Sequence, residues 1–153
     1  TVADTAIRQM AALNKAASEE MIAAKASAAT DITGYGLLGH AGEMAAASKV
    51  TIRIFASKLP VLPDALRLAG LGMNPGGAND NREFLKGKVS MTGNIDPRLE
   101  AVLYDPQTSG GLLIAVAESS ASRLKLALQA AGLAHEAIGR VEPAQAFPLV
   151  VEP

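Results

Sequence analysis

The chain has 153 residues with 14 basic and 15 acidic side chains, which is the size of one ordinary domain with almost no net charge. The balanced charge argues against a basic face for nucleic acid or a membrane surface, and an aromatic content of 3% without tryptophan excludes nucleic-acid modules built on aromatic stacking. The absence of cysteine excludes disulfides, thiolate metal sites and cysteine nucleophiles. No apolar run approaches the roughly 20 residues of a membrane span, and no secretory signal is recognisable, so we expect a cytoplasmic globular domain.

In the first third of the chain, apolar residues recur at three- and four-residue steps from position 4 to position 26, which predicts one long amphipathic helix. A short extended piece over 28–33 then ends in the turn Gly34-Tyr35-Gly36. The pattern predicts a second helix over 37–49, with Lys49 in its last turn. Strict alternation over 50–54 predicts a strand with one buried face.

The middle of the chain is rich in glycine and proline. Pro63 is expected in the first turn of a short helix that Gly70 closes, and residues 70–81 are expected to form an irregular loop. A weak strand is expected over 88–92. A helix is then expected through Leu103, with Asp96 as its N-cap and Pro97 at its first position.

The last third begins with an apolar run over 111–117, which is typical of a central strand buried on both faces. A helix capped by Ser119 or Ser120 is expected to end at Gly132. Strands over 137–141 and 147–151 complete the chain, and Pro148 favours an edge position for the last one. The order of elements predicts an α+β (mixed α/β) domain in which a mixed sheet packs against helices.

The first segment that suits chemistry is residues 30–40, Thr-Asp-Ile-Thr-Gly-Tyr-Gly-Leu-Leu-Gly-His. A carboxylate, Asp31, ends a short strand and is followed by a glycine-rich turn into a helix. The amides of a helix N-terminus favour anions, and Mg²⁺ is often held by one or two carboxylates with phosphate oxygens and water. Asp31 is therefore a candidate Mg²⁺ ligand. The alternative is that Asp31 or Thr33 caps the helix and the glycines only shape the turn.

Two further segments have an open interpretation. Residues 105–111, Asp-Pro-Gln-Thr-Ser-Gly-Gly, fit either the polar wall of a ligand site or a tight loop before a strand. Residues 75–82, Pro-Gly-Gly-Ala-Asn-Asp-Asn-Arg, fit either a cover over a site or a plain surface loop.

The remaining residues offer little chemistry. His40 is expected to be packed or exposed to solvent rather than catalytic, and His135 carries no further signal. No second carboxylate can be placed beside Asp31, so the chain is expected to hold half of a site. The chain opens at Thr1 directly before a helical pattern, which we interpret as a cut from a longer protein, with processing as the alternative.

Residues 29–40 and 105–113, with the Pro75-Gly76-Gly77 loop, Asn81 and Phe84 between them, resemble the C-terminal domain of the selenophosphate synthetases (selenide, water dikinases). The resemblance covers essentially the whole chain. It implies a C-terminal domain of the aminoimidazole ribonucleotide synthetase type, a group that also includes thiamine-monophosphate kinase. It also implies an N-terminal domain, absent here, that carries a cysteine or selenocysteine, a catalytic lysine, further metal-binding aspartates and the dimer interface.

Enzymes of this family convert selenide, ATP and water into selenophosphate, AMP and phosphate. The resemblance implies that Asp31 is the Mg²⁺-binding aspartate of the C-terminal domain and that no catalytic residue lies in this chain. Five residues are further expected near the substrate or its phosphates: Thr33, Gly34, Asn81, Thr108 and Ser109. Two departures from the family pattern are Tyr35, where phenylalanine is usual, and Ala78, where threonine is common. The second weakens a phosphate contact by side chains of that loop.

Three hypotheses follow from the sequence. The first is a selenophosphate synthetase C-terminal domain that is inactive alone and monomeric, within a homodimeric enzyme whose partners are its N-terminal domain, ATP and selenide. The second is a relative with another phosphate-activated substrate. The third is a non-catalytic interaction module, which would be favoured by a solvent-facing Asp31 far from residues 105–111.

Overall fold

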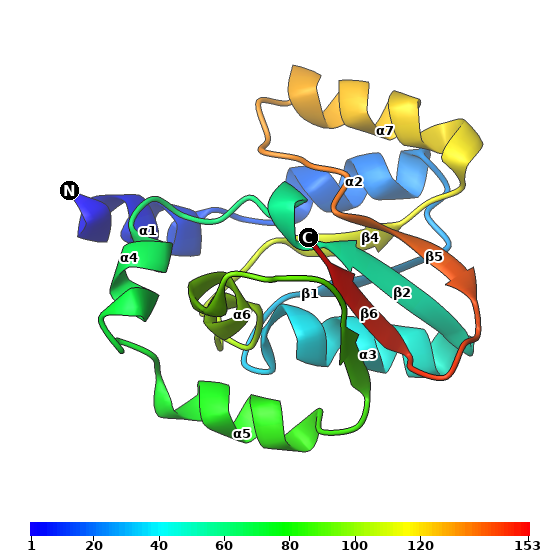
Figure 1. The fold of residues 1–153 in the computed structure, drawn as a ribbon. Coiled ribbons are helices and arrows are strands. Elements are labelled where there is room, and N and C mark those ends of the chain that lie inside the picture. The colour runs from blue at the N-terminus through cyan, green and yellow to red at the C-terminus, as the bar shows by residue number, and fades with distance from the viewer.

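The structure, a computed structural model, describes residues 1–153 and contains two separate β-sheets on either side of one helix, α3 (Gly36–Ser48) (Figure 1). The larger sheet has the strand order β3–β6–β2–β5, in which β6 is parallel to both of its neighbours and β5 is antiparallel to β2. Strands β1 and β4 form the second sheet and are antiparallel. The strands are β1 Ala28–Asp31, β2 Val50–Phe55, β3 Val89–Met91, β4 Leu112–Ala115, β5 Gly139–Pro143 and β6 Leu149–Glu152.

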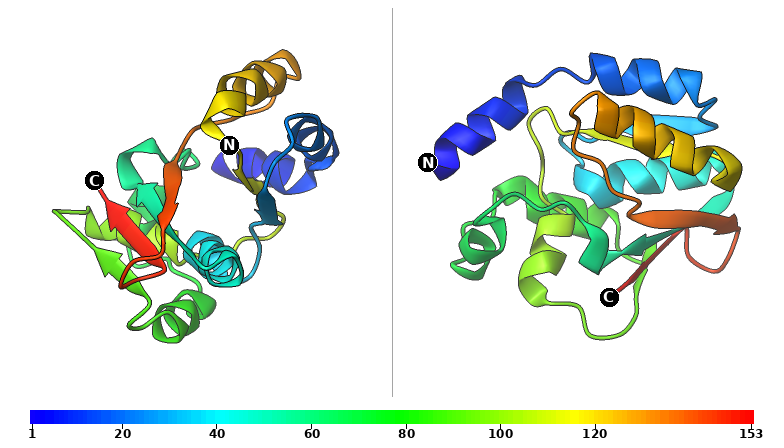
Figure 2. Two further views of the ribbon diagram at one scale, coloured as in Figure 1. Left: turned by 90° about the vertical axis from the view of Figure 1, so that its right-hand side faces the viewer. Right: turned by 90° about the horizontal axis from the view of Figure 1, so that it is seen from above.

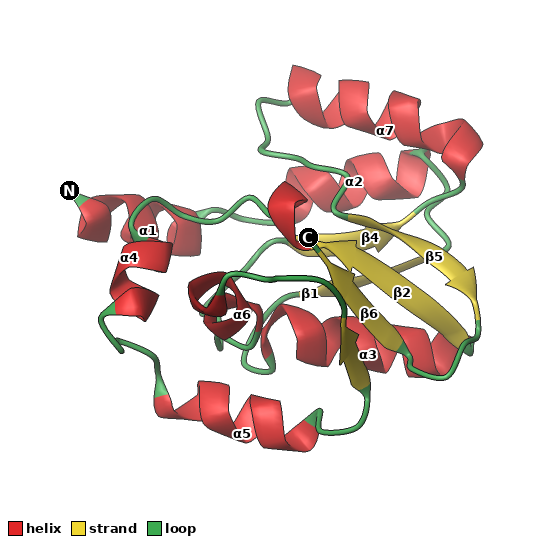
Figure 3. Ribbon diagram, in the orientation of Figure 1, coloured by secondary structure: helices red, strands yellow, loops and turns green.

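Seven helices accompany these two sheets, and none of them covers the face of the larger sheet that is turned toward the viewer in Figure 3 (Figures 2 and 3). They are α1 Val2–Ala11, α2 Lys15–Ala23, α3 Gly36–Ser48, α4 Ala65–Gly70, α5 Gly76–Phe84, α6 Pro97–Leu103 and α7 Glu118–Ala130, with a 3₁₀ turn at Ala56–Lys58. Helices α2 and α7 lie side by side against the two-stranded sheet, whereas α1 extends past the sheets and buries none of its residues. None of these helices is both long and apolar enough to span a membrane.

The main core lies between α3 and the four-stranded sheet. Leu38, Ala41 and Ala45 of α3 are fully buried against Ile54 of β2 and Leu149 of β6. The small residues of α3 permit this close packing. Helix α3 also packs against β1, so it contacts both sheets.

The two faces of β4 contact different clusters. Leu113 packs against the main core, while its neighbour Ile114 packs against a smaller cluster formed by Ala24, Leu124 and Leu128. Alternate residues of a strand point to opposite faces, so the two-stranded sheet separates α3 from the α2 and α7 pair.

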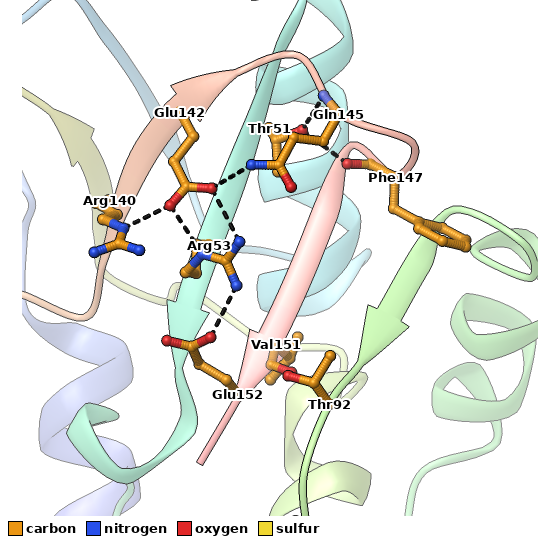
Figure 4. Close-up of polar contacts among 9 residues, drawn as sticks. All are labelled: Thr51, Arg53, Thr92, Arg140, Glu142, Gln145, Phe147, Val151 and Glu152. Carbon is orange, nitrogen blue, oxygen red and sulfur yellow. Dashed lines mark hydrogen bonds and ion pairs between the residues drawn. The ribbon is translucent and has the colours of Figure 1, made fainter.

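A network of charged side chains covers the face of the larger sheet that is turned away from α3 (Figure 4). Arg53 of β2 donates to Glu142 of β5 at 2.9 and 3.0 Å and to Glu152 of β6 at 2.8 Å, and Arg140 also donates to Glu142. These hydrogen bonds lower the pKa of Glu142 from 4.5 to about 2, with Arg53 making the largest contribution. The network joins three neighbouring strands.

The long helix expected over 4–26 is wrong, because the chain forms two helices, α1 and α2. Ala12 has an extended backbone, with ψ at 131°. Asn14 does not cap α2 with its side chain, which instead donates to the carbonyl of Gly110 at 3.0 Å. This long-range contact interrupts a pattern that is locally compatible with one helix.

The irregular loop expected over 70–81 is wrong in its second half, where α5 begins at Gly76. The two glycines suggested a loop, but Ala78, Asn81 and Leu85 are buried and recur at the three- and four-residue spacing of a helix. Tertiary burial of this stripe overrides the low helix propensity of the glycines and asparagines.

Three expectations about the last third of the chain are also wrong. Strand β4 is not central, because β1 is its one partner. Strand β6 is interior and not at an edge: Pro148 precedes its first residue, so the missing N–H removes no ladder hydrogen bond. Helix α7 begins at Glu118 with Ala117 as its N-cap, which places both candidate cap serines inside the first turn.

The other elements agree with the sequence. Strand β2 is confirmed, as is the weak strand at β3. Asp96 accepts from the amide of Arg98 at 2.9 Å and so caps α6, with Pro97 at its first position. Lys49 ends α3 in a left-handed conformation, and Gly132 follows α7 with φ at 70°. The short helix after Pro63 is α4, which begins two residues later, at Ala65, and reaches Gly70 as expected.

Candidate functional site

The two long sequence motifs lie side by side and are joined through their backbones. The amide of Ile32 donates to the carbonyl of Gly111 at 2.9 Å, and the amide of Gly110 donates back to the carbonyl of Ile32 at 2.9 Å. A third bond runs from the amide of Gln107 to the carbonyl of Thr33 at 3.0 Å. These bonds continue the β1–β4 ladder beyond the two strands and fix the loop 105–111 against the turn that follows Asp31.

Two glycines permit this close approach. A Cβ atom at Gly110 would lie 2.3 Å from the carbonyl oxygen of Ile32, and one at Gly36 would lie 2.8 Å from that of Asp105. Gly36 also has φ at 67°, which disfavours a side chain. Glycine is therefore required at both positions by backbone contact between the two motifs.

The third motif, in α5, meets the other two at the same point. The side-chain amide of Asn81 donates to the carbonyl of Gly34 and to that of Tyr104, each at 3.0 Å. Gly77 faces the ring of Pro106, which a Cβ atom would approach to 3.4 Å. Three segments far apart in the sequence thus converge, and the segment 75–82 belongs mostly to the helix α5 rather than to a loop.

Asp31 is the last residue of β1 and lies opposite Leu112. Its side chain is exposed and takes part in no hydrogen bond or ion pair within the chain. No group of three or more histidine, cysteine, aspartate or glutamate side chains is close enough to hold a metal ion. Asp31 therefore has a free carboxylate close to the point where the loop 105–111 joins β4, and its role as a metal ligand stays a prediction.

The capping alternative for this motif is wrong. The N-cap of α3 is Tyr35, and no side chain makes the capping hydrogen bond. The hydroxyl of Thr33 instead lies 3.0 Å from Nε2 of His40, whose Nδ1 lies 3.3 Å from a carboxylate oxygen of Glu43. His40 is packed, with 9% of its surface exposed, so its expected structural position is confirmed. Neither Asp31 nor Thr33 is used to begin the helix.

The remaining candidate residues differ in their exposure to solvent and in whether their side chains make hydrogen bonds within the chain. Thr108 and Ser109 are exposed, and Ser109 has a left-handed backbone with φ at 54°. Gly34 is exposed, and a Cβ atom there would meet nothing within 4 Å. Asn81, in contrast, is 6% exposed and uses its amide group to hold other segments. The structure brings all five candidates to one junction and gives Asn81 a positioning role.

Asp105 belongs to this junction and was not selected as a site residue. Its partial burial raises the pKa of its carboxyl above the ordinary value of 3.8, and no hydrogen bond counteracts that effect. A half-buried carboxylate without a partner is a typical feature of functional sites. In the sequence, only its position at the start of the polar segment 105–111 indicated that Asp105 could be a site residue.

Two exposed aromatic side chains border the junction. Tyr35 and Phe84 are each 54% exposed, and their rings stack with centroids 6.2 Å apart and planes inclined by 24°. Lys88 lies over the ring of Phe84, with Nζ 3.9 Å from the centroid. This contact joins the turn before α3 to the end of α5.

The fold and the converging motifs define a member of a known class of domains. The family model described as AIR synthase related protein, C-terminal domain, matches residues 4–152, and this chain belongs to that family. The match confirms the expected fold class, an α+β domain of the aminoimidazole ribonucleotide synthetase type.

Within this class, the chain is similar to curated proteins named selenide, water dikinase. It is 46% identical to the one from Pelobacter propionicus over 127 residues, covering 83% of this chain and 36% of the relative. It is also 46% identical to the one from Geobacter sp. strain M21 over 145 residues, covering 95% of this chain and 41% of the relative. The resemblance drawn from the motifs is thereby confirmed. The chain spans about two fifths of the length of these relatives.

A solved structure supports the fold independently. Thiamine-monophosphate kinase from Stenotrophomonas maltophilia K279a superposes with a TM-score of 0.54 at 21% identity, covering 82% of this chain and 31% of that one. At this level of identity the similarity concerns the fold alone.

Proposed function

We propose that this chain is the C-terminal domain of a selenophosphate synthetase and that it contributes Asp31 to a Mg²⁺–ATP site shared with an N-terminal domain of the same protein. The observation that carries the proposal is the position of Asp31. Its free carboxylate ends β1, and the residues that follow it are joined by three backbone hydrogen bonds to the loop that carries the exposed residues Thr108 and Ser109.

The residues at the junction fit Mg²⁺ as one part of its coordination shell. Mg²⁺ prefers oxygen ligands and is commonly bound by one or two carboxylates together with phosphate oxygens and water. Asp31 supplies such an oxygen and is not engaged elsewhere in the chain. When bound, the metal supplies neutralisation of the charge that develops on the phosphates. The remaining carboxylates would come from the N-terminal domain.

The complete enzyme would convert selenide, ATP and water into selenophosphate, AMP and phosphate. In that reaction this chain orients the polyphosphate and supplies no nucleophile or base. Asp31 holds negative charge at a fixed place, and the hydroxyl groups of Thr108 and Ser109, with the open backbone at Gly34, are available to phosphate oxygens. Asn81 and Thr33 position the turn that carries Gly34.

The proposal also specifies the partners of the chain. The N-terminal domain would carry the cysteine or selenocysteine, the catalytic lysine and the dimer contacts of a cytoplasmic homodimer. The third sequence hypothesis, a non-catalytic module, is not favoured, because Asp31 faces solvent beside the loop 105–111 and not far from it.

The decisive experiment replaces Asp31 by asparagine in the complete two-domain protein and measures AMP formation from ATP in the presence of selenide. Loss of one metal ligand is expected to lower kcat by about 100-fold or more. Asp80→Asn is the matched control, because Asp80 is an exposed carboxylate on α5. Unchanged activity of Asp31→Asn would refute the proposed role.

A second experiment tests whether the site is shared. The 153-residue chain is titrated with Mg²⁺ and a slowly hydrolysed ATP analogue while amide NMR shifts are recorded. Weak shifts confined to residues 30–40, and absent in Asp31→Asn, are expected of half a site. Tight, saturable binding would show that the nucleotide site is complete within this chain and would contradict the shared site.

A further inference from the structure

The outer edge of strand β1 is open. The two-stranded sheet has the order β1–β4, and Figure 2 (left) shows no element beside β1 on the side away from β4. The amide of Ile32 donates to the carbonyl of Gly111, and hydrogen-bonded pairs alternate along an antiparallel ladder. Counted back along β1, this alternation leaves the backbone amide and carbonyl groups of Ala29 and Asp31 pointing away from β4.

Three of these four outward backbone groups have no partner. The carbonyl of Asp31 accepts from the hydroxyl of Thr30 at 3.1 Å. No hydrogen bond outside the ladder involves the amide of Asp31 or the backbone of Ala29. Unpaired amide and carbonyl groups along a strand edge are a template for one more strand, which a second protein or another domain can supply.

The other sheet edges of the molecule are protected or enclosed, whereas the edge of β1 is neither. At one edge of the larger sheet, β5 carries Arg140 and Glu142 and ends in Pro143, and at the other edge β3 has only three residues. Charged side chains, proline and short length all keep edge strands from pairing. The free edge of β4 is turned toward the larger sheet (Figure 2). Strand β1, Ala-Ala-Thr-Asp, has no proline, and its one charge stands at its last residue.

An apolar hollow of about 350 Å³ adjoins this edge, between the end of α2 and β1. Five of its six lining residues are apolar: Met21, Ile22, Lys25, Ala26, Ala28 and Ala29. Ala28 and Ala29 are successive and point to opposite faces, so a hollow that touches both lies at the strand edge. Ile22 is 71% exposed, which leaves a large apolar side chain uncovered at the rim. A water molecule needs only about 10–15 Å³ of such space, so the hollow accommodates a bulky apolar side chain.

The position of Asp31 identifies the partner. The proposed function, on which this inference rests, requires an N-terminal domain of the same protein to bring further carboxylates to Asp31. Residues of a strand are spaced about 3.3 Å apart, so Ala29 lies about 7 Å from Asp31 along the same edge. A domain that shares a metal ion with Asp31 therefore also reaches the open edge at Ala29 and the hollow beside it.

We infer that an extended segment of the N-terminal domain pairs with the open edge of β1 and places an apolar side chain in the hollow beside Ile22. Its backbone bonds to the amide and carbonyl of Ala29 and to the amide of Asp31, which extends the two-stranded sheet by one strand. In this mode of recognition, main-chain hydrogen bonds provide affinity and side-chain pockets provide specificity. Pairing that includes Asp31 also fixes the spacing between the two halves of the proposed metal site.

The test measures backbone hydrogen exchange at residue resolution in the complete two-domain protein, without Mg²⁺ or ATP. The amides of Ala29 and Asp31 are expected to exchange at least about 100-fold more slowly than those of an unstructured chain. The amide of Val141 is the internal control. The ladder between β2 and β5 leaves this amide pointing outward from the protected edge of β5, so rapid exchange is expected there.

A pair of variants tests the hollow. Ile22→Ser removes the apolar side chain at its rim and is expected to accelerate exchange at Ala29 by at least about tenfold. Leu126→Ser is the matched control, because Leu126 is 66% exposed on α7, and it is expected to leave the exchange at Ala29 unchanged. Both side chains are exposed, so neither substitution is expected to unfold the domain.

Three outcomes would overturn the inference: exchange at Ala29 as rapid as at Val141, equal exchange at Ala29 in Ile22→Ser and Leu126→Ser, or slow exchange only at high protein concentration, which would assign the edge to a second copy. Asp31→Asn is expected to keep exchange at Ala29 slow. Rapid exchange at Ala29 in a protein that Asp31→Asn inactivates would refute this inference alone. Slow exchange with full activity of Asp31→Asn would refute the metal role alone.

Discussion

Replacement of Asn81 by alanine is expected to destabilise the fold by about 3 kcal/mol. The change removes two hydrogen bonds of 3.0 Å, one to the carbonyl of Gly34 and one to that of Tyr104. Gly34 is exposed, so water replaces the first bond and the loss is about 1 kcal/mol. Tyr104 is 6% exposed, and a buried carbonyl left without a partner costs a further 1–3 kcal/mol or so.

For a domain of this size, about 3 kcal/mol corresponds to a fall in melting temperature of roughly 6–12 °C. Thermal unfolding followed by circular dichroism measures it. Asn79→Ala is the matched control on the same helix, because Asn79 is exposed, and it is expected to stay within about 0.5 kcal/mol of the parent chain. Equal melting temperatures for Asn79→Ala and Asn81→Ala would refute the view that Asn81 holds the three motifs together.

The variant Asn81→Asp tests whether the two hydrogen bonds need the amide hydrogens of Asn81. The substitution keeps the shape of the side chain but turns a carboxylate oxygen toward two carbonyl oxygens, so the buried acid is favoured in its protonated form. The variant is therefore expected to be less stable at pH 7 than at pH 4, relative to the parent chain. A variant as stable as the parent at pH 7 would show that the amide hydrogens are not needed.

Two further predictions concern carboxyl groups with shifted pKa values. Glu142 has a pKa of about 2 because Arg53 and Arg140 donate to it, so it stabilises the fold above its ordinary pKa of 4.5 and loses that contribution as the pH falls toward 2. The melting temperature of Glu142→Gln should therefore lie below that of the parent chain at pH 7 and approach it near pH 2; a constant difference would contradict this. Burial raises the pKa of Asp105, so its charged form disfavours the folded state at pH 7 and the penalty disappears as the pH falls toward 3.8. Asp105→Asn should raise the melting temperature at pH 7 but not below pH 3.8, and a lower value at pH 7 would show that the carboxylate has a stabilising partner.

The sequence predicted most elements whose signals are local. Alternation located β2, and the Asp96-Pro97 pair located the start of α6. The errors arise where a distant contact decides the structure. Asn14 interrupts the first helix because its side chain reaches Gly110, and β6 is interior because β2 and β3 both pair with it. Neither fact has a signature in neighbouring residues.

The division into two sheets could not be predicted either. An apolar strand such as β4 is compatible with any number of neighbours, and its covered faces are explained equally well by helices. In the structure both of its faces are packed, one toward α3 and one toward the α2 and α7 pair, yet it has a single strand partner. Burial of side chains and completion of a sheet are separate properties, and only the first is encoded in hydrophobicity.

Prediction of the candidate site was limited in the same way, because contacts between distant segments decide which of its residues are exposed. The motifs identified three segments that converge in the structure, but they did not separate residues that hold the junction from residues whose side chains are exposed. Gly36, Gly110 and Asn81 are constrained by contacts between segments, whereas Asp31 and Ser109 have exposed side chains. A binding group must be free in the absence of its ligand, and it can be both free and fixed only if buried neighbours hold its backbone. In the proposed function, the glycines and the asparagine hold the backbone near Asp31, and a substitution among them should reduce binding through the position of the loop rather than through a lost contact.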